Sequence, residues 1–405
     1  MDFFPKGIRM TQKNGLVLEK SSSWTPERVL IPLYPKGIGL VPVGTRVKKG
    51  ALLGEEGGFA PENGILREYR ELNHPMLGKV LCAVLELELE KKKKEQRRGN
   101  PQLEGARKPE DILKAARHSG ILEECSGELL WKQMEHMMAS PPELIAADAL
   151  DDDPIPQAGA AFFIKEKHKV IRGLTYLSQA LGGVQERVAW NSRWVGEAME
   201  DLPARYSLRL KNRYPAWEIF EESHRGAACR VGVQALAALA DASERQMPQT
   251  HTVITVGGDA FAAPRLCKVP IGTPVGDLLE HCGIGARPCQ AVMGSALSGY
   301  NILDPDTPVI ASTRCIVVWR PTSERLDDRV FPCIGCGKCQ RACPKGLEPW
   351  VVQDALGQDP IPENMLWNVE ACTQCGVCRA VCPSGIDLLA CMRQAAELRK
   401  RGGLI

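Results

Sequence analysis

The distribution of apolar and polar residues predicts strands in the first quarter of the chain. Between residues 29 and 56, short apolar runs are interrupted by glycine, a pattern typical of strands joined by tight turns. The stretch 79–90, KVLCAVLELELE, ends in strict alternation that places Leu85, Leu87 and Leu89 on one face. Successive side chains of a strand point to opposite faces, so this alternation predicts a strand with one buried face. We therefore expect an all-β region here.

The pattern becomes helical in the middle of the chain. Residues 109–122 have helical spacing of apolar residues, with Pro109 near the start, where a helix tolerates proline. Residues 170–183 form an amphipathic pattern that ends at a glycine pair. Residues 205–215 have the pattern of a strand, and residues 230–244 that of a strand edge running into a helix. This alternation predicts an α/β domain.

The last third begins with strands and ends with helices. Residues 250–258 and 314–319 are β-rich, and TPVGDLLEHCG is predicted to be a short helix with Thr273 as its N-cap. The final helix is predicted over 386–401, with a basic last turn that suits the helix dipole.

Composition narrows the class of protein. The chain has 405 residues, of which 44% are apolar, enough for several packed domains. A net charge of +2 and only 5% aromatic residues give no sign of nucleic-acid binding. No apolar run reaches the roughly 18–20 residues of a membrane span, and no signal peptide is apparent. We expect a cytoplasmic protein without direct membrane insertion, in which residues 90–108 form a charged linker.

Sixteen cysteines carry the strongest chemical signal. Eight of them form two segments of the pattern C-x2-C-x2-C-x3-C-P, at 333–344 and 372–383. In two-cluster ferredoxins, this spacing wraps three thiolates around one [4Fe–4S] cluster and sends the fourth to the other cluster. Zinc sites, the alternative, use two well-separated cysteine pairs that close on one ion. The predicted ligands of the first cluster are Cys333, Cys336, Cys339 and Cys382, and those of the second are Cys343, Cys372, Cys375 and Cys378.

Such a module transfers electrons without bond chemistry, because every iron carries a cysteine. The remaining eight cysteines have no ligand spacing, and we expect small buried side chains there. They are Cys82, Cys125, Cys229, Cys267, Cys282, Cys289, Cys315 and Cys391.

The order of these parts resembles the RnfC family, the peripheral NADH-facing subunits of Rnf complexes. The likeness covers nearly the whole chain and is most specific at 173–183, 213–215, 267–283 and 291–300, and in the cysteine module. The resemblance implies a multidomain α/β plus β fold. The four expected parts are a barrel-sandwich hybrid with linker at 1–100, an α/β domain like the complex I 51-kDa subunit at 101–250, a β-grasp SLBB domain at 251–322, and an α-helical two-[4Fe–4S] ferredoxin module at 323–405.

The chain departs from that family where a flavin would bind. Members that bind FMN and NADH carry a glycine-rich turn of the type GGAGFP, which brings bare backbone against phosphate. Here the matching loop, residues 118–131, has Glu123, Glu124 and Glu128 instead. The family's acidic segment corresponds to DALDDDP, 148–154, which keeps the proline and lacks Asn-Gly. The departures favour a degenerate domain without FMN.

The sequence thus predicts an iron–sulfur electron-transfer subunit that relays single electrons between redox partner subunits of a cytoplasmic oxidoreductase complex. The alternative is an FMN-containing NADH dehydrogenase subunit that feeds its own clusters. No catalytic acid, base or nucleophile can be assigned, and GGDAF at 257–261 is taken as an ordinary turn. The run Asp151–Asp153 is expected to be a solvated turn, with a cation site as the alternative.

Overall fold

The computed structural model describes most of the chain. Leu89, Cys289 and nearly all of the predicted linker lie outside the described residues. Those residues are 6–9, 22–34, 37–88, 108–155, 158–192, 199, 201–224, 227–284, 290–320, 329–362, 366 and 368–400.

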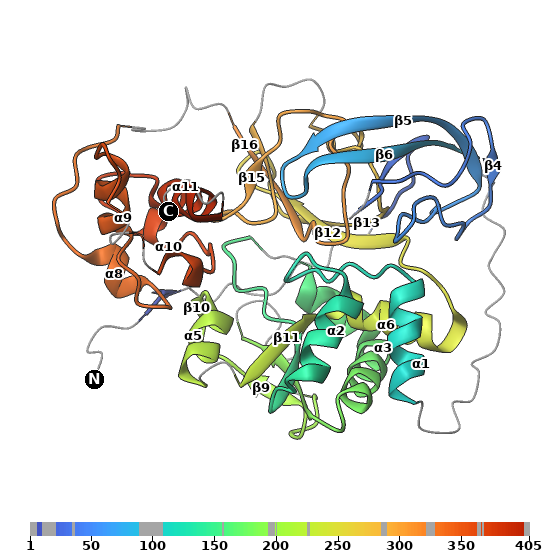
Figure 1. Ribbon diagram of the computed structural model, residues 1–405, viewed down its shortest axis with the longest axis horizontal. Helices are drawn as coiled ribbons and strands as arrows, with labels where there is room; N and C mark the ends of the chain where they lie inside the picture. Colours follow the sequence, from blue (N-terminus) through green and yellow to red (C-terminus); the bar gives the residue numbers. More distant parts are fainter. Residues whose placement is uncertain are drawn as a thin grey trace.

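A four-stranded antiparallel sheet forms the N-terminal part, as the alternating pattern predicted (blue in Figure 1). Leu85 and Leu87 face its core, together with Val29 and Leu66. The sheet order is β3-β6-β5-β4, with bounds β3 Arg28–Pro32, β4 Arg46–Val47, β5 Gly64–His74 and β6 Gly78–Leu87.

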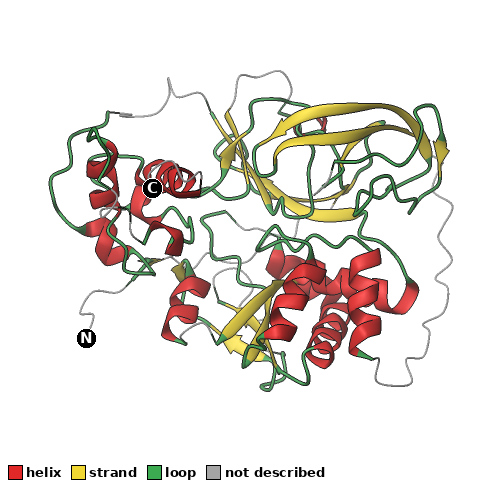
Figure 2. Ribbon diagram, in the orientation of Figure 1, coloured by secondary structure: helices red, strands yellow, loops and turns green. Residues whose placement is uncertain are grey.

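The predicted α/β part is built on a four-stranded sheet in which every pair of neighbours is parallel. Its order is β11-β7-β8-β9, and the helices pack beside it (Figures 1 and 2). The helix predicted at 170–183 is the second half of a longer helix, α3. The strands are β7 Leu144–Asp148, β8 Gln185–Trp190, β9 Ser207–Arg209 and β11 Ala228–Gly232; the helices are α1 Pro109–His118, α2 Leu130–Ala139, α3 Gly159–Ala180, α5 Ala216–Ser223 and α6 Val233–Arg245.

Helices α3 and α6 lie in direct contact because one residue of α3 has no side chain. A Cβ atom on Gly173 would stand 1.8 Å from the carbonyl oxygen of Leu236 in α6. The two backbones can approach this closely only at glycine. The contact holds α6 so that its N-terminus, at Val233, lies near the loop after α1.

A mixed sheet of six strands follows, in the order β15-β14-β16-β12-β13-β2. Strand β12 pairs antiparallel with β13 and parallel with β16. Its elements are β2 Ser22–Ser23, β12 His251–Gly257, β13 Arg265–Pro270, α7 Val275–His281, β14 Gln290–Met293, β15 Tyr300–Asn301 and β16 Cys315–Trp319.

The predicted N-cap of the short helix is wrong. Helix α7 begins at Val275 with Pro274 at the cap position and no side-chain cap bond. The hydroxyl of Thr273 instead donates to the carbonyl of Pro270, 2.8 Å away, because Thr273 lies one residue too early and closes the turn that follows β13.

The C-terminal part is helical and lies at one end of the molecule (orange to red in Figure 1). Its core contains Leu347, Val352, Leu366 and Met392. The elements are α8 Lys338–Ala342, α9 Pro349–Leu356, the 3₁₀ turn η3 Val369–Ala371, α10 Val377–Ala380 and α11 Leu388–Lys400.

Residues 6–9 join this helical part to the α/β part. Strand β1, Ile8–Arg9, pairs antiparallel with β10, Arg213–Tyr214. The backbone N–H of Gly7 donates to Ala342, 2.9 Å away, at the end of α8. The ammonium group of Lys6 donates to the carbonyl of Pro344, also at 2.9 Å. We call residues 6–9 the N-terminal strap.

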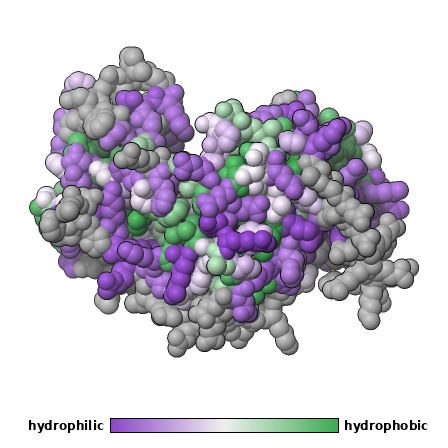
Figure 3. Space-filling model, turned by 90° about the horizontal axis from the view of Figure 1, so that it is seen from below, coloured by the Kyte–Doolittle hydropathy of each residue, from purple (hydrophilic) through white to green (hydrophobic). Residues whose placement is uncertain are grey.

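The lower face of the molecule is mainly hydrophilic, with smaller hydrophobic areas between the hydrophilic ones (Figure 3). Within the described parts of the chain, no helix combines the length and apolar character of a membrane span.

Candidate iron–sulfur centre and the adjoining cavity

One small cavity in the helical part is lined by four cysteines from the two motif segments. Cys372, Cys375 and Cys378 come from the second segment, and Cys343 crosses over from the first. This is the set that the spacing predicted for the second cluster. The rest of the lining is largely apolar and includes Leu347, Pro349, Val377, Leu389 and Met392.

Backbone groups of the second segment are turned toward the thiols. Gln374 and Gly376 have positive φ values of 54° and 78°, which fold the segment tightly around the cavity. The N–H of Gln374 lies 3.4 Å from the sulfur of Cys372. Gly376 is also pressed against the neighbouring β part, since a Cβ there would stand 2.3 Å from the carbonyl oxygen of Leu297.

The first set reaches the surface at Cys333, whereas the second set, which we call the deeper set, has no exposed member. Cys333 is exposed, Cys336 and Cys382 are half-buried, and Cys339 is buried. Two hydrogen bonds tie the start of the first segment to the end of the second. The N–H of Phe331 donates to the carbonyl of Ser384 at 2.9 Å, and the Ser384 hydroxyl donates to the carbonyl of Pro332 at 3.0 Å.

The chemistry of the deeper cysteine set fits an iron–sulfur cluster. Burial raises the pKa of Cys375 and of Cys378 to about 12, and for Cys378 the neighbouring thiols Cys375 and Cys372 raise it further. Four thiolates in an apolar cavity require a cationic partner. In the described part of the chain, no three such side chains converge closely enough for a single ion. A [4Fe–4S] cubane can bind four thiolates that lie farther apart than the ligands of a single ion, because each thiolate binds a different iron.

Three parts of the molecule meet beside this cavity. The hydroxyl of Tyr214, from the α/β part, donates to the carbonyl of Cys375 at 2.7 Å. The hydroxyl of Tyr300, from the mixed sheet, donates to Gln374 at 3.3 Å. The Arg393 guanidinium lies 4.0 Å from the centre of the Tyr300 ring and donates to Ser298. The sequence predicts none of these roles, although the resemblance at 213–215 includes Tyr214.

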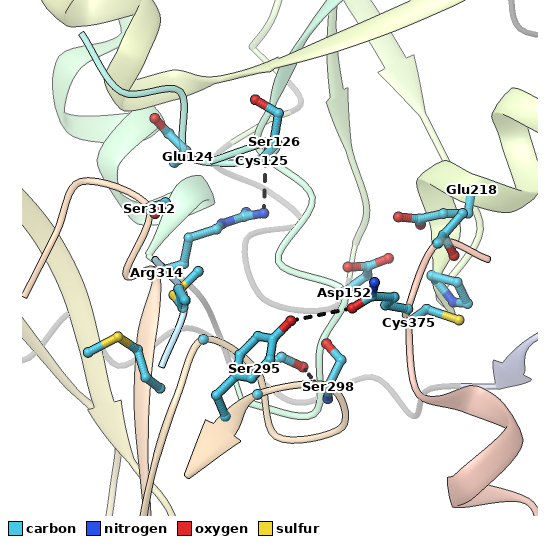
Figure 4. A pocket seen from close by; sticks show the side chains of 18 of the residues that line it. Glu124, Cys125, Ser126, Asp152, Glu218, Ser295, Ser298, Ser312, Arg314 and Cys375 are labelled. Atoms are coloured by element: carbon cyan, nitrogen blue, oxygen red, sulfur yellow. Dashed lines mark hydrogen bonds between the residues drawn. The ribbon is translucent and has the colours of Figure 1, made fainter. Parts of the chain in front are cut away.

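A second cavity of about 380 Å³ opens next to Cys372 and Cys375 (Figure 4). Its walls come from the loop after α1, the acidic segment after β7, the mixed sheet and the cysteine module. We call it the junction cavity. Charged residues in its lining are Glu124, Asp152, Glu218, Arg230, Arg314 and Arg393.

Two buried glutamates of the altered 118–131 loop accept hydrogen bonds from backbone N–H groups. Glu124 accepts hydrogen bonds from the N–H groups of Gln234 and Ala235, at 2.7 and 2.8 Å. Glu123 accepts one from Gly232 at 2.6 Å. These donors belong to the start of helix α6, where a helix offers free N–H groups and a partial positive charge.

The fit around Glu124 is close. A Cβ on Gly232 would stand 2.0 Å from the Glu124 carboxyl carbon. Burial raises the pKa of Glu124 to about 8, and the charge of Glu123 adds to this, whereas the N–H of Gln234 opposes it. A carboxyl group of the chain therefore occupies donors that a phosphate could otherwise use.

The expectation of a solvated turn at Asp151–Asp153 is wrong. Asp151 and Asp153 are buried. The carboxyl group of each of the three aspartates accepts hydrogen bonds from backbone N–H groups. Asp151 accepts from Gly159 and Ala160 at the start of α3, and Asp152 accepts from Ala216 at the start of α5. Helix starts supply the donors that make burial of these acids favourable.

Asp153 reaches the mixed sheet. Its carboxyl accepts hydrogen bonds from the Ser295 hydroxyl and from the N–H of Ala296. Burial raises the pKa of Asp152 to about 7 and that of Asp153 to about 6; for Asp152, the nearby Glu218 raises it further.

A buried ion network lies under the same cavity. Asp148, at the end of β7, is 3.0 Å from Arg314 and 3.8 Å from Arg230. The Cys125 thiol also donates to Asp148 at 3.1 Å. Burial raises the pKa of Asp148, but the two arginines outweigh burial and hold the pKa at about 2. The sequence offered no signal for the pairing of Asp148 with Arg314, because the two residues lie 166 positions apart.

Comparison with known proteins identifies the cysteine module. Residues 332–386 match the family described as a 4Fe-4S dicluster domain. The chain carries an iron–sulfur domain. The remainder of the molecule is mixed α and β structure, as predicted.

Curated relatives support the resemblance stated above. The chain is 27% identical over 365 residues to the C subunit of the ion-translocating oxidoreductase complex of Vibrio cholerae serotype O1, covering 81% of this chain and 46% of that protein. It is 34% identical over 104 residues to the protein of the same name from Rhodobacter capsulatus, covering 25% and 20%. The likeness to RnfC is confirmed. The chain spans about half the length of the Vibrio relative.

Among solved structures, an NAD+-reducing [NiFe]-hydrogenase in the air-oxidized state matches with a TM-score of 0.47 and 15% identity. The match covers 72% of this chain and 63% of that one.

Proposed function

We propose that this chain is an iron–sulfur electron-transfer subunit without its own flavin. It relays single electrons between redox partner subunits of a cytoplasmic oxidoreductase complex, as the similarity to the RnfC proteins of ion-translocating complexes suggests. In this proposal the chain is cytoplasmic and peripheral to a membrane complex, which is supported by relatives named as subunits of ion-translocating complexes.

The observation that carries the proposal is the cavity shared by Cys343 and the second cysteine segment. A thiol contributed across segments supports the two-cluster arrangement, in which each segment completes the other's site. When bound, two [4Fe–4S] clusters supply one-electron transfer. The chain's residues hold the clusters, exclude water and orient the module against Tyr214 and the mixed sheet. The proposed ligands are Cys333, Cys336, Cys339 and Cys382 for one cluster, and Cys343, Cys372, Cys375 and Cys378 for the other.

The absence of flavin is proposed from the contacts of Glu123 and Glu124. Their carboxyl groups accept hydrogen bonds from the free N–H groups at the start of α6. A side chain at position 232 would collide with the carboxyl group of Glu124, so glycine is needed there. A flavin phosphate would have to displace a buried acid there. The junction cavity beside Cys375 favours the alternative, an FMN-containing NADH dehydrogenase subunit, because it leaves room next to the deeper cluster site.

The finer domain assignments are also proposals. The antiparallel sheet β3-β6-β5-β4 supports a barrel-sandwich hybrid, and the parallel pairing of β12 with β16 supports an SLBB domain of β-grasp type. The parallel sheet supports a 51-kDa-like domain. Four separate buried clusters support divisions at 1–100, 101–250, 251–322 and 323–405.

The test is the iron and flavin content of protein purified without oxygen. About eight irons per chain and no flavin are expected, from two cubanes. About eight irons with one FMN would support the alternative, and an NADH oxidation assay would then follow. Fewer than about four irons per chain after reconstitution would contradict both the flavin-less electron relay and the FMN-containing alternative.

A further inference from the structure

Three side chains form a hydrogen-bonded group against the second cysteine segment. The side-chain oxygen of Gln374 accepts hydrogen bonds from the Tyr300 hydroxyl and from Nε of Arg393, both at 3.3 Å. The Arg393 guanidinium also lies 4.0 Å from the centre of the Tyr300 ring and donates to the carbonyl of Ser298. Tyr300 comes from the mixed sheet and Arg393 from α11. We call Tyr300, Gln374 and Arg393 the Gln374 clamp.

The clamp holds a residue that donates to a predicted cluster ligand. Gln374 has a φ of 54°, a conformation that costs energy for a residue other than glycine unless its surroundings hold it. Its backbone N–H lies 3.4 Å from the sulfur of Cys372 and donates to it. The two hydrogen bonds to the Gln374 side chain therefore fix the position of a backbone donor to the deeper set.

Arg393 brings a positive charge to the same thiol. Burial raises the pKa of Cys372, and the neighbouring Cys343 thiol adds to this, whereas the N–H of Gln374 and the charge of Arg393 lower it. The N–H group and the guanidinium thus both favour negative charge on this sulfur.

The first segment makes the same turn with a different residue. Gly335 stands there at the position that Gln374 has in the second segment. It also has a positive φ, of 65°, and a Cβ atom on it would meet no other atom within 4 Å. The turn itself therefore does not require glutamine with two side-chain donors. The clamp is a feature of the deeper set, and it points to a role that the first set does not share.

We propose that the Gln374 clamp raises the reduction potential of a cluster held by the deeper set. The proposal rests on the proposed function, because it requires a cluster there. Reduction adds one electron and no atom; no bond forms or breaks, and no proton moves. Net charge, hydrogen bonds to sulfur and exposure to solvent set such potentials. Tyr300 and Arg393 are positioning residues that act through Gln374, and Arg393 acts through its charge as well.

The clamp matters for a relay because the two sets have different surroundings. The cavity of the deeper set has a largely apolar lining, which disfavours the negative charge that reduction adds. The first set reaches solvent at Cys333. An electron passes readily between two sites only where their potentials are close. By offsetting the effect of burial, the clamp keeps the electron from being held at the first set.

The test is a redox titration of the full chain, reconstituted without oxygen, with dithionite as reductant and electron paramagnetic resonance as readout. Two one-electron steps are expected. The step that remains in Cys336→Ala is assigned to the deeper set, because Cys336 belongs to the first. In Arg393→Gln, we expect the equilibrium of that step to shift at least about tenfold against reduction, which is about 59 mV for one electron.

A conservative variant and a matched control separate the clamp from a general effect of charge. Arg393→Lys keeps the charge and should recover at least about half of the shift in potential. Arg117→Gln removes the same charge from an arginine that lies 4.3 Å from the Trp131 ring, on α1 at the opposite end of the molecule (Figure 1). It should change the equilibrium by less than about twofold, because solvent and salt screen it.

A milder variant avoids the loss of a charge beside the cluster site. Gln374→Gly copies the residue of the first segment, and glycine adopts the required φ without strain. It removes the acceptor that Tyr300 and Arg393 share, so reduction of the deeper set should become at least about threefold less favourable. An iron content of about eight per chain shows that both clusters are present in each variant that is compared.

An unchanged potential in Arg393→Gln or in Gln374→Gly, with iron retained, would overturn the proposal. Equal shifts of the two steps would also overturn it, as would an Arg393→Lys chain that shifts as far as Arg393→Gln. If Arg393→Gln loses iron, Gln374→Gly decides alone. A wild-type chain that binds no iron, or that has no reducible step, would overturn the proposed function instead.

Discussion

Acidic residues beneath the junction cavity hold the interior together through a buried ion network and through hydrogen bonds to backbone N–H groups. Asp148 is ionised between two arginines, whereas Glu124, Asp152 and Asp153 have pKa values raised by burial. The sequence placed all these acids in the family's cofactor-binding segments. Their actual partners are helix starts, two arginines and the mixed sheet at Ser295, which no local pattern reveals.

Asp148→Asn should destabilise the fold by about 3–5 kcal/mol, because it removes the buried counter-charge that lies 3.0 Å from Arg314, whereas Arg230 keeps Glu218 at 2.8 Å. Urea unfolding at neutral pH measures this. Asp201→Asn, an exposed matched change, should shift stability by less than about 0.5 kcal/mol. Equal unfolding midpoints for the two variants would show that the network contributes nothing.

Stability should fall as pH rises from about 5 to about 8. The folded-state pKa values of Glu124, Asp152 and Asp153, about 8, 7 and 6, lie above those of an unfolded chain. The folded state therefore binds more protons in this window, and raising the pH favours unfolding. Asp148 acts oppositely, since its lowered pKa gives stability that is lost only as pH falls below about 4 toward 2.

Glu124→Gln isolates one contribution to that pH dependence. The amide cannot titrate, so the decline in unfolding free energy toward pH 8 should become shallower. Absolute stability at low pH should also fall, because the amide N–H₂ cannot accept from a backbone N–H of α6. Parallel stability curves for variant and wild type would exclude Glu124 as a titrating group.

At the scale of elements, helices and strands with long periodic patterns were predicted well, and their ends less so. The alternation ending at Leu87 and the helical spacing of 170–183 both reflect burial against a core, which the chain encodes locally. Thr273 failed as a cap because the turn after β13 uses its hydroxyl. The start of α3 was missed because Asp151, eight residues upstream, supplies the acceptor.

Gly173→Ala should destabilise the α/β part by about 1–3 kcal/mol, because its Cβ would collide with the Leu236 carbonyl and force α3 and α6 apart. Thermal unfolding monitored by circular dichroism measures the loss. Gly357→Ala is the matched control, since its nearest atom would be 3.4 Å away. A Gly173→Ala protein as stable as that control would mean that the helices can separate at little cost.

At the scale of the whole molecule, the cysteine spacing grouped Cys343 with the second segment, and these four thiols line one cavity. It gave no sign that Tyr214 and Tyr300 from two other parts would hold the module in place. Metal-ligand spacing is a local property of the chain. Contacts between domains depend on surfaces that form only after each domain has folded.

Paired cysteine variants test the crossed arrangement. Cys343→Ala and Cys375→Ala should remove the same cluster, so the double variant should keep about four irons. Cys343→Ala with Cys336→Ala should affect both clusters and leave almost none, with the broad absorbance near about 400 nm lost. If the Cys343–Cys336 pair kept about four irons instead, each segment would hold its own cluster.

The N-terminal strap has a consequence for the order in which the protein is made. Residues 6–9 are synthesised before their partners, which are β10 and the end of α8, and the Lys6 bond to Pro344 spans 338 positions. The strap therefore has no surface to bind until translation has passed both. The contacts by which the strap joins the cysteine module to the α/β part can accordingly form only late in the synthesis of each chain.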